Sequence, residues 1–178
     1  DTPGIIKPNY KLQEKMMEAA EAALADRKPA TMSVNTVHPE GYCFIRHYEF
    51  EDGTYGGDNF GTFSGKTIKG HTREADNALQ LVKFTREGAK DVIMMNWQGH
   101  PCFTGGTKKT DVSADYIGAV RKYMEEKTGG LFAFFQGASG NVTTGSKIPG
   151  ERITNDHATY GTLLGEWSML LYEKLEPV

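Results

Sequence analysis

Two apolar runs in the second half of the chain constrain its fold more than any other feature. Residues 92–97 are almost continuously apolar, and residues 131–135 repeat the pattern. A run of this length without alternation is typical of a central strand of a sheet. Each run is followed by a loop of small or polar residues and then by a helical pattern, over residues 114–127 and 154–175. This order predicts an α/β fold, a layered domain with a mixed, partly parallel sheet flanked by helices.

The first half of the chain is expected to add one helix and further strands. Leu12, Met16 and Ala19 recur at helical spacing, and Pro29 closes that segment. Glycine is dense over residues 51–72, where apolar periodicity is lost, so a long loop or irregular hairpin is expected there. The remaining expected elements are a helix over residues 10–26, strands over 30–37 and 42–50, and two adjacent strands over 76–85 and 90–96 joined by a turn at 86–89.

Length and charge argue against several classes of function. The 178 residues are enough for one domain with its own core, expected to span residues 1–178. With 20 basic and 23 acidic side chains there is no basic stripe for nucleic acid, and no apolar run approaches the length of a membrane span. Cys43 and Cys102 make no disulfide framework, which favours a reducing, cytoplasmic compartment. The sequon that begins at Asn141 keeps secretion open as an alternative.

His100 follows the first apolar run, at the point where Pro101 turns the chain out of the sheet. Strand ends in α/β sheets are where open sites are usually built, so His100 is a candidate metal ligand or general base. The alternative is a hydrogen-bonded core histidine without a chemical role. The second apolar run ends in a comparable loop, residues 136–141, and the two strand ends could line one pocket.

Two further charged residues are candidates for the same pocket. Arg46 lies on the aromatic strand, where alternation places it on the same face as Tyr48 and opposite His47. An arginine that points into a pocket suits recognition of a carboxylate or an oxyanion, and a surface strand of mixed charge is the alternative. Asp115 lies in the first turn of its expected helix, where a carboxylate stabilises the exposed amides. It also follows a glycine-rich loop that could fold back over His100.

Other motifs carry weaker signals. Ser139 is placed almost as in the nucleophile elbow of serine hydrolases, but Asn141 stands where the second glycine should be. A turn that lets two backbones approach closely is expected there instead. Residues 105–110 lack the spacing of a phosphate-binding loop and predict a solvated basic turn. Three histidines have no partner at ligand spacing and are expected at the surface, namely His38, His71 and His157.

Several segments occur in the order and spacing of a known family. They are Arg46 after an aromatic strand, Asp76 before the strand pair, Asn96-Trp97 leading to His100-Pro101, residues 113–118 opening a helix, and residues 134–142 ending a strand. Together they resemble the neutral/alkaline (non-lysosomal) ceramidase family, in the central part of its N-terminal catalytic domain. The resemblance extends from about residue 10 to the end of the last helix. It implies that the chain is a fragment of a longer ceramidase-like catalytic domain.

The resemblance implies an α/β domain with a zinc-centred pocket that hydrolyses an amide bond. On that basis His100 corresponds to one of two zinc-binding histidines. Arg46 corresponds to the arginine that faces the substrate amide or the catalytic centre, and Asp115 falls in a segment near the site. The substrate implied is a small-molecule or lipid amide.

The chain also departs from the pattern of the family. In the family the glutamine of the nucleophile loop is followed by the catalytic serine, whereas here Gln136 is followed by Gly137. Ala138 and Asn141 belong to the same loop. The second zinc-binding histidine of the family lies upstream of the helix that begins near residue 10, and the remaining ligands, a glutamate and a tyrosine, lie beyond the end of this chain. The zinc site is therefore expected to be incomplete in this chain, because a hydrolytic site takes three protein ligands and a water.

Two functions remain as alternatives. The first is a ceramidase-like zinc amidohydrolase, completed by flanking segments or by a partner chain in a homo-oligomer, in which water replaces the serine and Arg46 stabilises the oxyanion. The second is a non-catalytic ligand-binding or core fragment that uses the glycine-rich residues 53–70 for a ligand or partner. The presence of His100 together with Arg46 favours the first, and Gly137 favours the second. Whether this chain is an enzyme by itself stays open.

Overall fold

The computed structural model describes residues 10–57, 63–104 and 112–178. Contacts between Cα atoms divide the chain into two compact units, Asp1–Ala30 and Thr31–Val178, and each is described by itself. The expectation of a single domain over residues 1–178 stays a prediction. The helices are α1 (Lys11–Ala25), α2 (Asp115–Thr128) and α3 (His157–Tyr172). The strands are β1 (Ala30–Val37), β2 (Phe44–Ile45), β3 (His47–Phe50), β4 (Tyr55–Gly57), β5 (Ile68–His71), β6 (Leu79–Arg86), β7 (Val92–Trp97), β8 (Leu131–Gln136), β9 (Val142–Thr143) and β10 (Glu176–Pro177).

The first unit contains helix α1. Alanine, glutamate and lysine fill most of its positions, and these residues have high helix propensity. Met17 is its buried residue, and Pro29 follows shortly after the helix ends at Ala25. The helix expected over residues 10–26 is therefore confirmed.

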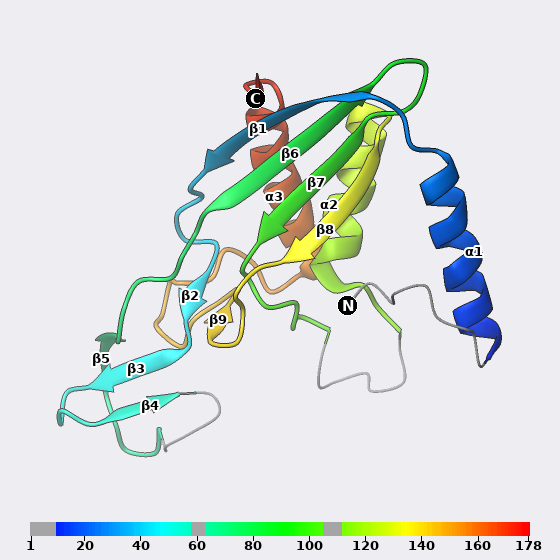
Figure 1. Cartoon of the computed structure of the whole chain (residues 1–178). Coiled ribbons are helices and arrows are strands. Elements are labelled where there is room, and N and C mark those ends of the chain that lie inside the picture. The colour runs from blue at the N-terminus through cyan, green and yellow to red at the C-terminus, as the bar shows by residue number, and fades with distance from the viewer. Residues whose placement is uncertain (1–9, 58–62, 105–111) are drawn as a thin grey trace. The chain divides into compact units, whose positions relative to one another are not determined.

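The second unit is built on a five-stranded sheet in the order β10-β1-β6-β7-β8 (Figure 1). Strands β6 and β7 are antiparallel, with Leu81 opposite Met95, whereas β7 and β8 are parallel, with Met95 opposite Phe134. A parallel pair needs a crossover connection, and α2 supplies it between β7 and β8. The predicted α/β fold with a mixed, partly parallel sheet is confirmed.

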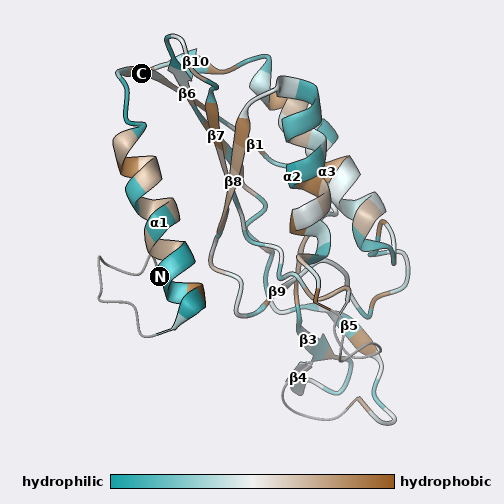
Figure 2. Cartoon of the chain, turned by 90° about the vertical axis from the view of Figure 1, so that its right-hand side faces the viewer, coloured by the Kyte–Doolittle hydropathy of each residue, from teal (hydrophilic) through white to brown (hydrophobic). Residues whose placement is uncertain are grey.

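Helices α2 and α3 lie on the same face of this sheet (Figure 2). The side chains that fill the space between the two layers are fully buried, and they alternate along the strands as a half-covered sheet requires. They include Leu79, Leu81, Ile93, Met95 and Trp97 from the sheet and Tyr116, Val120, Met124, Tyr160 and Leu164 from the helices. The helices touch each other closely at Gly161, where a Cβ would lie 2.5 Å from the carbonyl oxygen of Tyr116.

The aromatic strand expected over residues 42–50 is divided in two, which corrects that prediction. Strand β2 pairs with β9, whereas β3 joins a separate three-stranded sheet in the order β4-β3-β5. The division falls at Arg46, and burial changes parity there: Cys43 and Ile45 are buried before it, Tyr48 and Phe50 after it. Strict alternation therefore does not hold across Arg46, and the expectation that Arg46 and Tyr48 share a strand face is wrong. The expected irregular hairpin over residues 51–72 contains β4 and β5 in its described part.

The helix ends follow local hydrogen bonding more closely than hydrophobic periodicity. Helix α3 begins at His157, not at Thr154, because the carboxylate of Asp156 accepts a hydrogen bond from the Thr159 amide. Helix α2 ends at Thr128, and Gly129 directly after it adopts a left-handed φ of 70°, as expected of a glycine after a helix. The turn expected over residues 105–110 lies outside the described residues.

Candidate functional site

The carboxyl ends of the parallel strands β7 and β8 meet at one edge of the sheet, where the expected site lies. Gln136, the last residue of β8, turns its side-chain amide toward β7 and donates from Nε2 to the carbonyl oxygen of Trp97 at 3.0 Å and of Gly99 at 3.5 Å. The Gly137 amide donates to the same Trp97 oxygen at 2.9 Å. These bonds extend the ladder one step beyond the strands and fix the starts of both loops relative to each other.

His100 is the next residue along β7's extension, and it pairs with Thr143 in an isolated parallel bridge. Its amide donates to the Val142 carbonyl at 3.3 Å. Nδ1 of its ring is buried and has no hydrogen-bond partner in the part of the chain that the structure describes. A functionless core histidine is expected to satisfy that nitrogen, so this geometry favours the interpretation of His100 as a site residue.

Gln98 is a further candidate for this site that no sequence pattern indicated. Its Nε2 donates to Oδ2 of Asp76 at 3.2 Å, and its Oε1 is the other buried side-chain atom without a partner among the described residues. The side chain packs against Gly137, where a Cβ would lie 2.9 Å from Cγ of Gln98. A close approach was expected between two backbones at this glycine, whereas Gly137 is approached closely by the side chain of Gln98. The two unpartnered buried atoms, Oε1 of Gln98 and Nδ1 of His100, lie within three residues of the end of β7 and mark this place as a candidate site. Such unpartnered atoms can be recognised only in a structure.

Arg46 reaches the same edge from the break between β2 and β3. Its Nη2 donates to the Gly140 carbonyl at 2.6 Å, and its backbone amide donates to the Asn141 carbonyl at 3.0 Å. The guanidinium therefore holds the loop after β8 in place. In the described residues only this one guanidinium nitrogen is engaged, so its other N–H groups are free to bind an oxygen of a ligand.

The loop after β8 forms a turn in which the Val142 amide donates to the Ser139 carbonyl at 2.9 Å. Ala138 and Gly140 are exposed, and a Cβ on Gly140 would meet no atom within 4 Å. The expected close approach of two backbones is therefore absent at Gly140. Asn141 contributes its carbonyl oxygen to Arg46 and precedes β9 directly.

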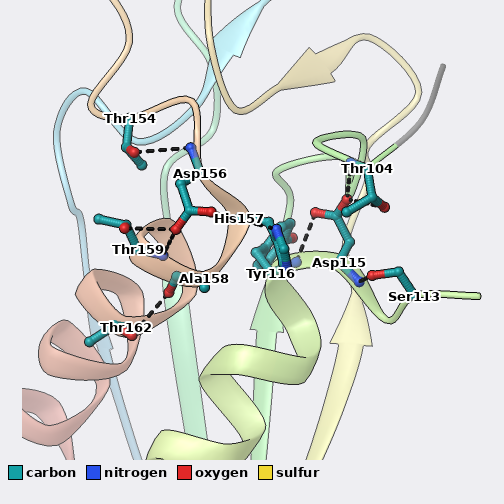
Figure 3. A network of polar contacts seen from close by, with 10 residues as sticks. All are labelled: Thr104, Ser113, Asp115, Tyr116, Thr154, Asp156, His157, Ala158, Thr159 and Thr162. Atoms are coloured by element: carbon teal, nitrogen blue, oxygen red, sulfur yellow. Dashed lines mark hydrogen bonds and ion pairs between the residues drawn. The ribbon is translucent and has the colours of Figure 1, made fainter. Parts of the chain in front are cut away.

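Asp115 is buried, with 7% of its surface exposed, and its carboxylate binds two segments (Figure 3). Oδ2 accepts from the amide and the hydroxyl of Thr104 at 2.8 and 3.0 Å, while Oδ1 accepts from the Tyr116 amide at 2.8 Å. Tyr116 in turn donates from its hydroxyl to the Gly99 carbonyl. Because burial raises the pKa of Tyr116, the phenol stays protonated and remains a donor.

His71 corrects the expectation that the remaining histidines are surface residues. Only 15% of its side chain is exposed, it contacts the rings of Phe44 and Tyr48, and its Nε2 lies 2.7 Å from Oε2 of Glu151. His38 is exposed, as expected, and its Nδ1 lies 3.0 Å from Oδ1 of Asn77. A pattern-based search could not find the Glu151 contact because 80 residues separate the partners.

A pocket of about 560 Å³ lies beside β2, the strand that pairs with β9. Its lining is largely polar and includes Glu40, Arg73 and Glu74 together with His71. Cys43 also lines it, and burial followed by the nearby Asp76 carboxylate raises the pKa of that thiol to about 12. Cys43 is therefore a neutral thiol at neutral pH, which excludes it as a thiolate nucleophile.

The described residues do not make a zinc site by themselves. No group of three or more His, Cys, Asp or Glu side chains in residues 10–57, 63–104 and 112–178 could hold a metal ion. His100 offers one buried ring nitrogen without a partner, which suits one ligand of a larger set. No helix in the described part of the chain is long and apolar enough to span a membrane.

The arrangement of these elements matches solved structures of ceramidases. The neutral ceramidase from Pseudomonas aeruginosa superimposes with a TM-score of 0.63 and 12% sequence identity, over 90% of this chain and 25% of that one. The fold is that of part of a neutral ceramidase. A structure described as a ceramidase complexed with C2 gives a TM-score of 0.60 and 14% identity, over 90% of this chain and 26% of that one. The chain thus spans about a quarter of the ceramidase chains it matches, and the expected resemblance is confirmed for the fold. No protein-family model matches the sequence, and no curated protein matches it.

Proposed function

We propose that this chain is the core of a ceramidase-like hydrolase that cleaves an amide C–N bond. The observation that carries the proposal is the buried, unpartnered Nδ1 of His100 at the carboxyl edge of the parallel strands. An unsatisfied polar atom in such a position is costly unless a ligand completes it. The ceramidase fold supplies the class of reaction, and the substrate is a small-molecule or lipid amide.

In this proposal His100 is one zinc ligand, and segments outside the described residues or a partner chain supply the others. Zinc would polarise the scissile carbonyl as a Lewis acid. Arg46 binds the developing oxyanion with the guanidinium N–H groups that the Gly140 carbonyl leaves free. Gln136 holds the ends of β7 and β8 at a fixed spacing. Gly137 offers no side-chain nucleophile, so water attacks the carbonyl.

The experiment is zinc analysis combined with an amidase assay, on the 178-residue chain and on the longer protein that contains it. The longer protein should retain about one zinc per chain after dialysis and lose it in His100→Ala. His38→Ala is the matched control, because His38 is exposed and bonded only to Asn77 in the described residues. The 178-residue chain should retain no stoichiometric zinc. Retention of zinc or of amidase activity by the His100→Ala protein would contradict the proposal.

A substitution of Thr143 tests whether the nucleophile is water or a side-chain hydroxyl. Thr143 pairs with His100 and is buried, so its hydroxyl is the alternative to water near the histidine. If water is the nucleophile, Thr143→Val should keep most of the amidase activity of the longer protein. Loss of activity with retained zinc would assign the role to Thr143 instead.

The second candidate function is a non-catalytic binding core with the same fold. Two observations favour it, namely Gly137 in the loop after β8 and the lack of a three-ligand cluster in the described residues. The polar pocket beside β2 would then hold the ligand. Arg73→Ala separates the two functions, because Arg73 lines that pocket and no hydrogen bond or ion pair joins it to His100 in the described part of the chain. It should leave zinc retention unchanged and weaken only the binding of a ligand in the pocket.

A further inference from the structure

Two consecutive residues of helix α2 hold the segment that carries His100, one on each side of the histidine. The Tyr116 hydroxyl donates to the carbonyl of Gly99, which directly precedes His100. The Asp115 carboxylate accepts from the amide and the hydroxyl of Thr104, four residues after His100. The stretch 99–104 is therefore attached at both ends to one turn of one helix (Figure 3 shows the Asp115 side).

This attachment matters because the ring of His100 lacks the usual means of orientation. A functional histidine is normally oriented by a hydrogen bond to its second ring nitrogen. In the described residues neither ring nitrogen of His100 has a hydrogen-bond partner, so neither orients the ring, and the amide of His100 is bonded to the Val142 carbonyl at 3.3 Å. The direction of the ring consequently depends on the position of its backbone, and that position depends on the bonds to Val142, Tyr116 and Asp115.

Helix α2 is a firm support for this attachment. Tyr116 is fully buried, and its ring packs against Phe103 of the His100 segment at a centroid distance of 6.4 Å, against Phe134 at 6.0 Å and against Tyr160 at 5.0 Å. The space on the other side of the segment is also filled, because a Cβ on Gly99 would lie 2.7 Å from Nε1 of Trp97. The segment has little room to move without breaking the bonds to α2.

We propose that Asp115 and Tyr116 are positioning residues that fix the backbone, and through it the ring direction, of His100. This proposal rests on the proposed function in one respect, namely that His100 is the residue that binds the metal ion. Neither residue touches the ring nitrogen itself. The substitution Tyr116→Phe removes one attachment and keeps the ring packing, and Asp115→Ala removes the other. Asp115→Asn keeps an oxygen that can accept from Thr104 and should restore the position of the segment.

The test is amide hydrogen exchange and side-chain NMR of the labelled 178-residue chain at one fixed pH. The amide of His100 is the informative probe, since it is bonded to Val142 and to neither changed side chain. In Tyr116→Phe and in Asp115→Ala its exchange should become about five- to tenfold faster relative to the core amide of Met95, the factor expected when one ordinary hydrogen bond is lost from a local opening equilibrium. The ring carbon and proton signals of His100 should shift in the same variants, and Asp115→Asn should return both readouts toward those of the unchanged protein.

Matched substitutions separate positioning from general loss of stability. Tyr48 is an equally buried residue of β3, which belongs to another sheet, and its hydroxyl accepts from the Lys147 amide; Tyr48→Phe should leave the His100 signals in place. If Asp115→Ala does not fold, Thr104→Val removes one of the same two bonds from the other side. Unchanged exchange and unchanged ring signals of His100 in folded Tyr116→Phe and Thr104→Val would overturn the proposal. The exchange rate and the ring signals of His100 can be measured without zinc or a substrate. A failure of the hydrolase proposal can therefore be told apart from a failure of the positioning proposal.

Discussion

The N-terminal ends of α2 and α3 use the same residue types in two different ways. Each has an aspartate that binds the amide and the hydroxyl of a threonine. Asp156 binds Thr159, three residues later in its own helix, at 2.7 and 2.8 Å, and 56% of its side chain is exposed. Asp115 binds Thr104, eleven residues earlier and outside its helix, and it is buried. An exposed aspartate that satisfies its own helix is a cap, whereas a buried one that reaches another segment is a tertiary tether.

The largest effect is expected where the two helix starts touch. Gly161→Ala would place a Cβ 2.5 Å from the Tyr116 carbonyl oxygen and 2.6 Å from Cβ of Ala119, so backbone must move. We expect a loss of about 3 to 4 kcal/mol in the free energy of unfolding, measured by urea denaturation. Gly118→Ala on α2 is the control, because only Cβ of Ala114 lies near, at 3.2 Å, and better helix propensity offsets the contact. Equal losses in both variants would show that the helices do not depend on this contact.

The tether should matter more than the cap. Asp115→Ala leaves the amides of Thr104 and of the buried Tyr116 without their acceptor, and it places alanine at a φ of 53°. We expect a loss of about 2 to 3 kcal/mol by the same measurement. In Asp115→Gly the glycine adopts the positive φ without strain but offers no acceptor. The free energy of unfolding of this variant therefore separates the effect of backbone strain from that of the lost hydrogen bonds. The comparison fails if Asp156→Ala is as destabilised as Asp115→Ala.

The buried tyrosines Tyr116 of α2 and Tyr160 of α3 extend the comparison of the two helix ends, with smaller expected effects on stability. The Tyr116 hydroxyl donates to Gly99 and the Tyr160 hydroxyl donates to the Tyr42 carbonyl, at 2.6 Å in the latter case. Tyr116→Phe should lose about 1 kcal/mol in thermal or urea unfolding, and Tyr160→Phe should lose more, because the Tyr160 hydroxyl also accepts from Nε1 of Trp97. Only the first should also speed exchange of the His100 amide. Equal exchange in both variants would mean that α2 has no special relation to the histidine.

The smallest effect concerns the exposed cap and its dependence on pH. Hydrogen bonds from Thr159 lower the pKa of Asp156 in the folded protein. The stabilisation from the ionised carboxylate is therefore present above the pKa of an unfolded aspartate and is lost as the pH falls through the lower folded pKa. Asp156→Ala should lie below the unchanged protein in urea midpoint at neutral pH and converge with it in acid. A difference that stays constant with pH would show that the charge of Asp156 contributes nothing.

Much of the main sheet could be predicted from the sequence, because its strands carry strong patterns. The alternation over residues 30–37 gave β1 correctly, and the continuous apolar runs identified β7 and β8 as a parallel pair. Strands β9 and β10 were missed because two residues carry no periodicity. The division at Arg46 was missed because β2 pairs with β9, a strand distant in sequence, whereas β3 pairs with the neighbouring β4, and local alternation does not record that change of partner.

The functional roles of the candidate site residues stay predictions. Gln136 and Gly137 bond to the end of β7, His100 pairs with Thr143, and Arg46 binds the loop after β8 at the Gly140 carbonyl. Their partners were not predictable, since Gln98, Thr104 and the Gly99 carbonyl act through contacts that exist only after folding. Asp115 illustrates the limit of pattern analysis, because a carboxylate in a first helical turn looks the same in sequence as a cap or as a tether.

The positive φ of Asp115 has a consequence for natural variation. It is the one residue other than glycine with a positive φ in the described ranges. Aspartate and asparagine are the residues that both tolerate that conformation and offer an oxygen to Thr104. Among close homologues that keep this fold, position 115 should therefore alternate between these two residues while position 104 stays threonine or serine. Position 156, which needs only a cap, should drift freely among serine, threonine, asparagine and aspartate.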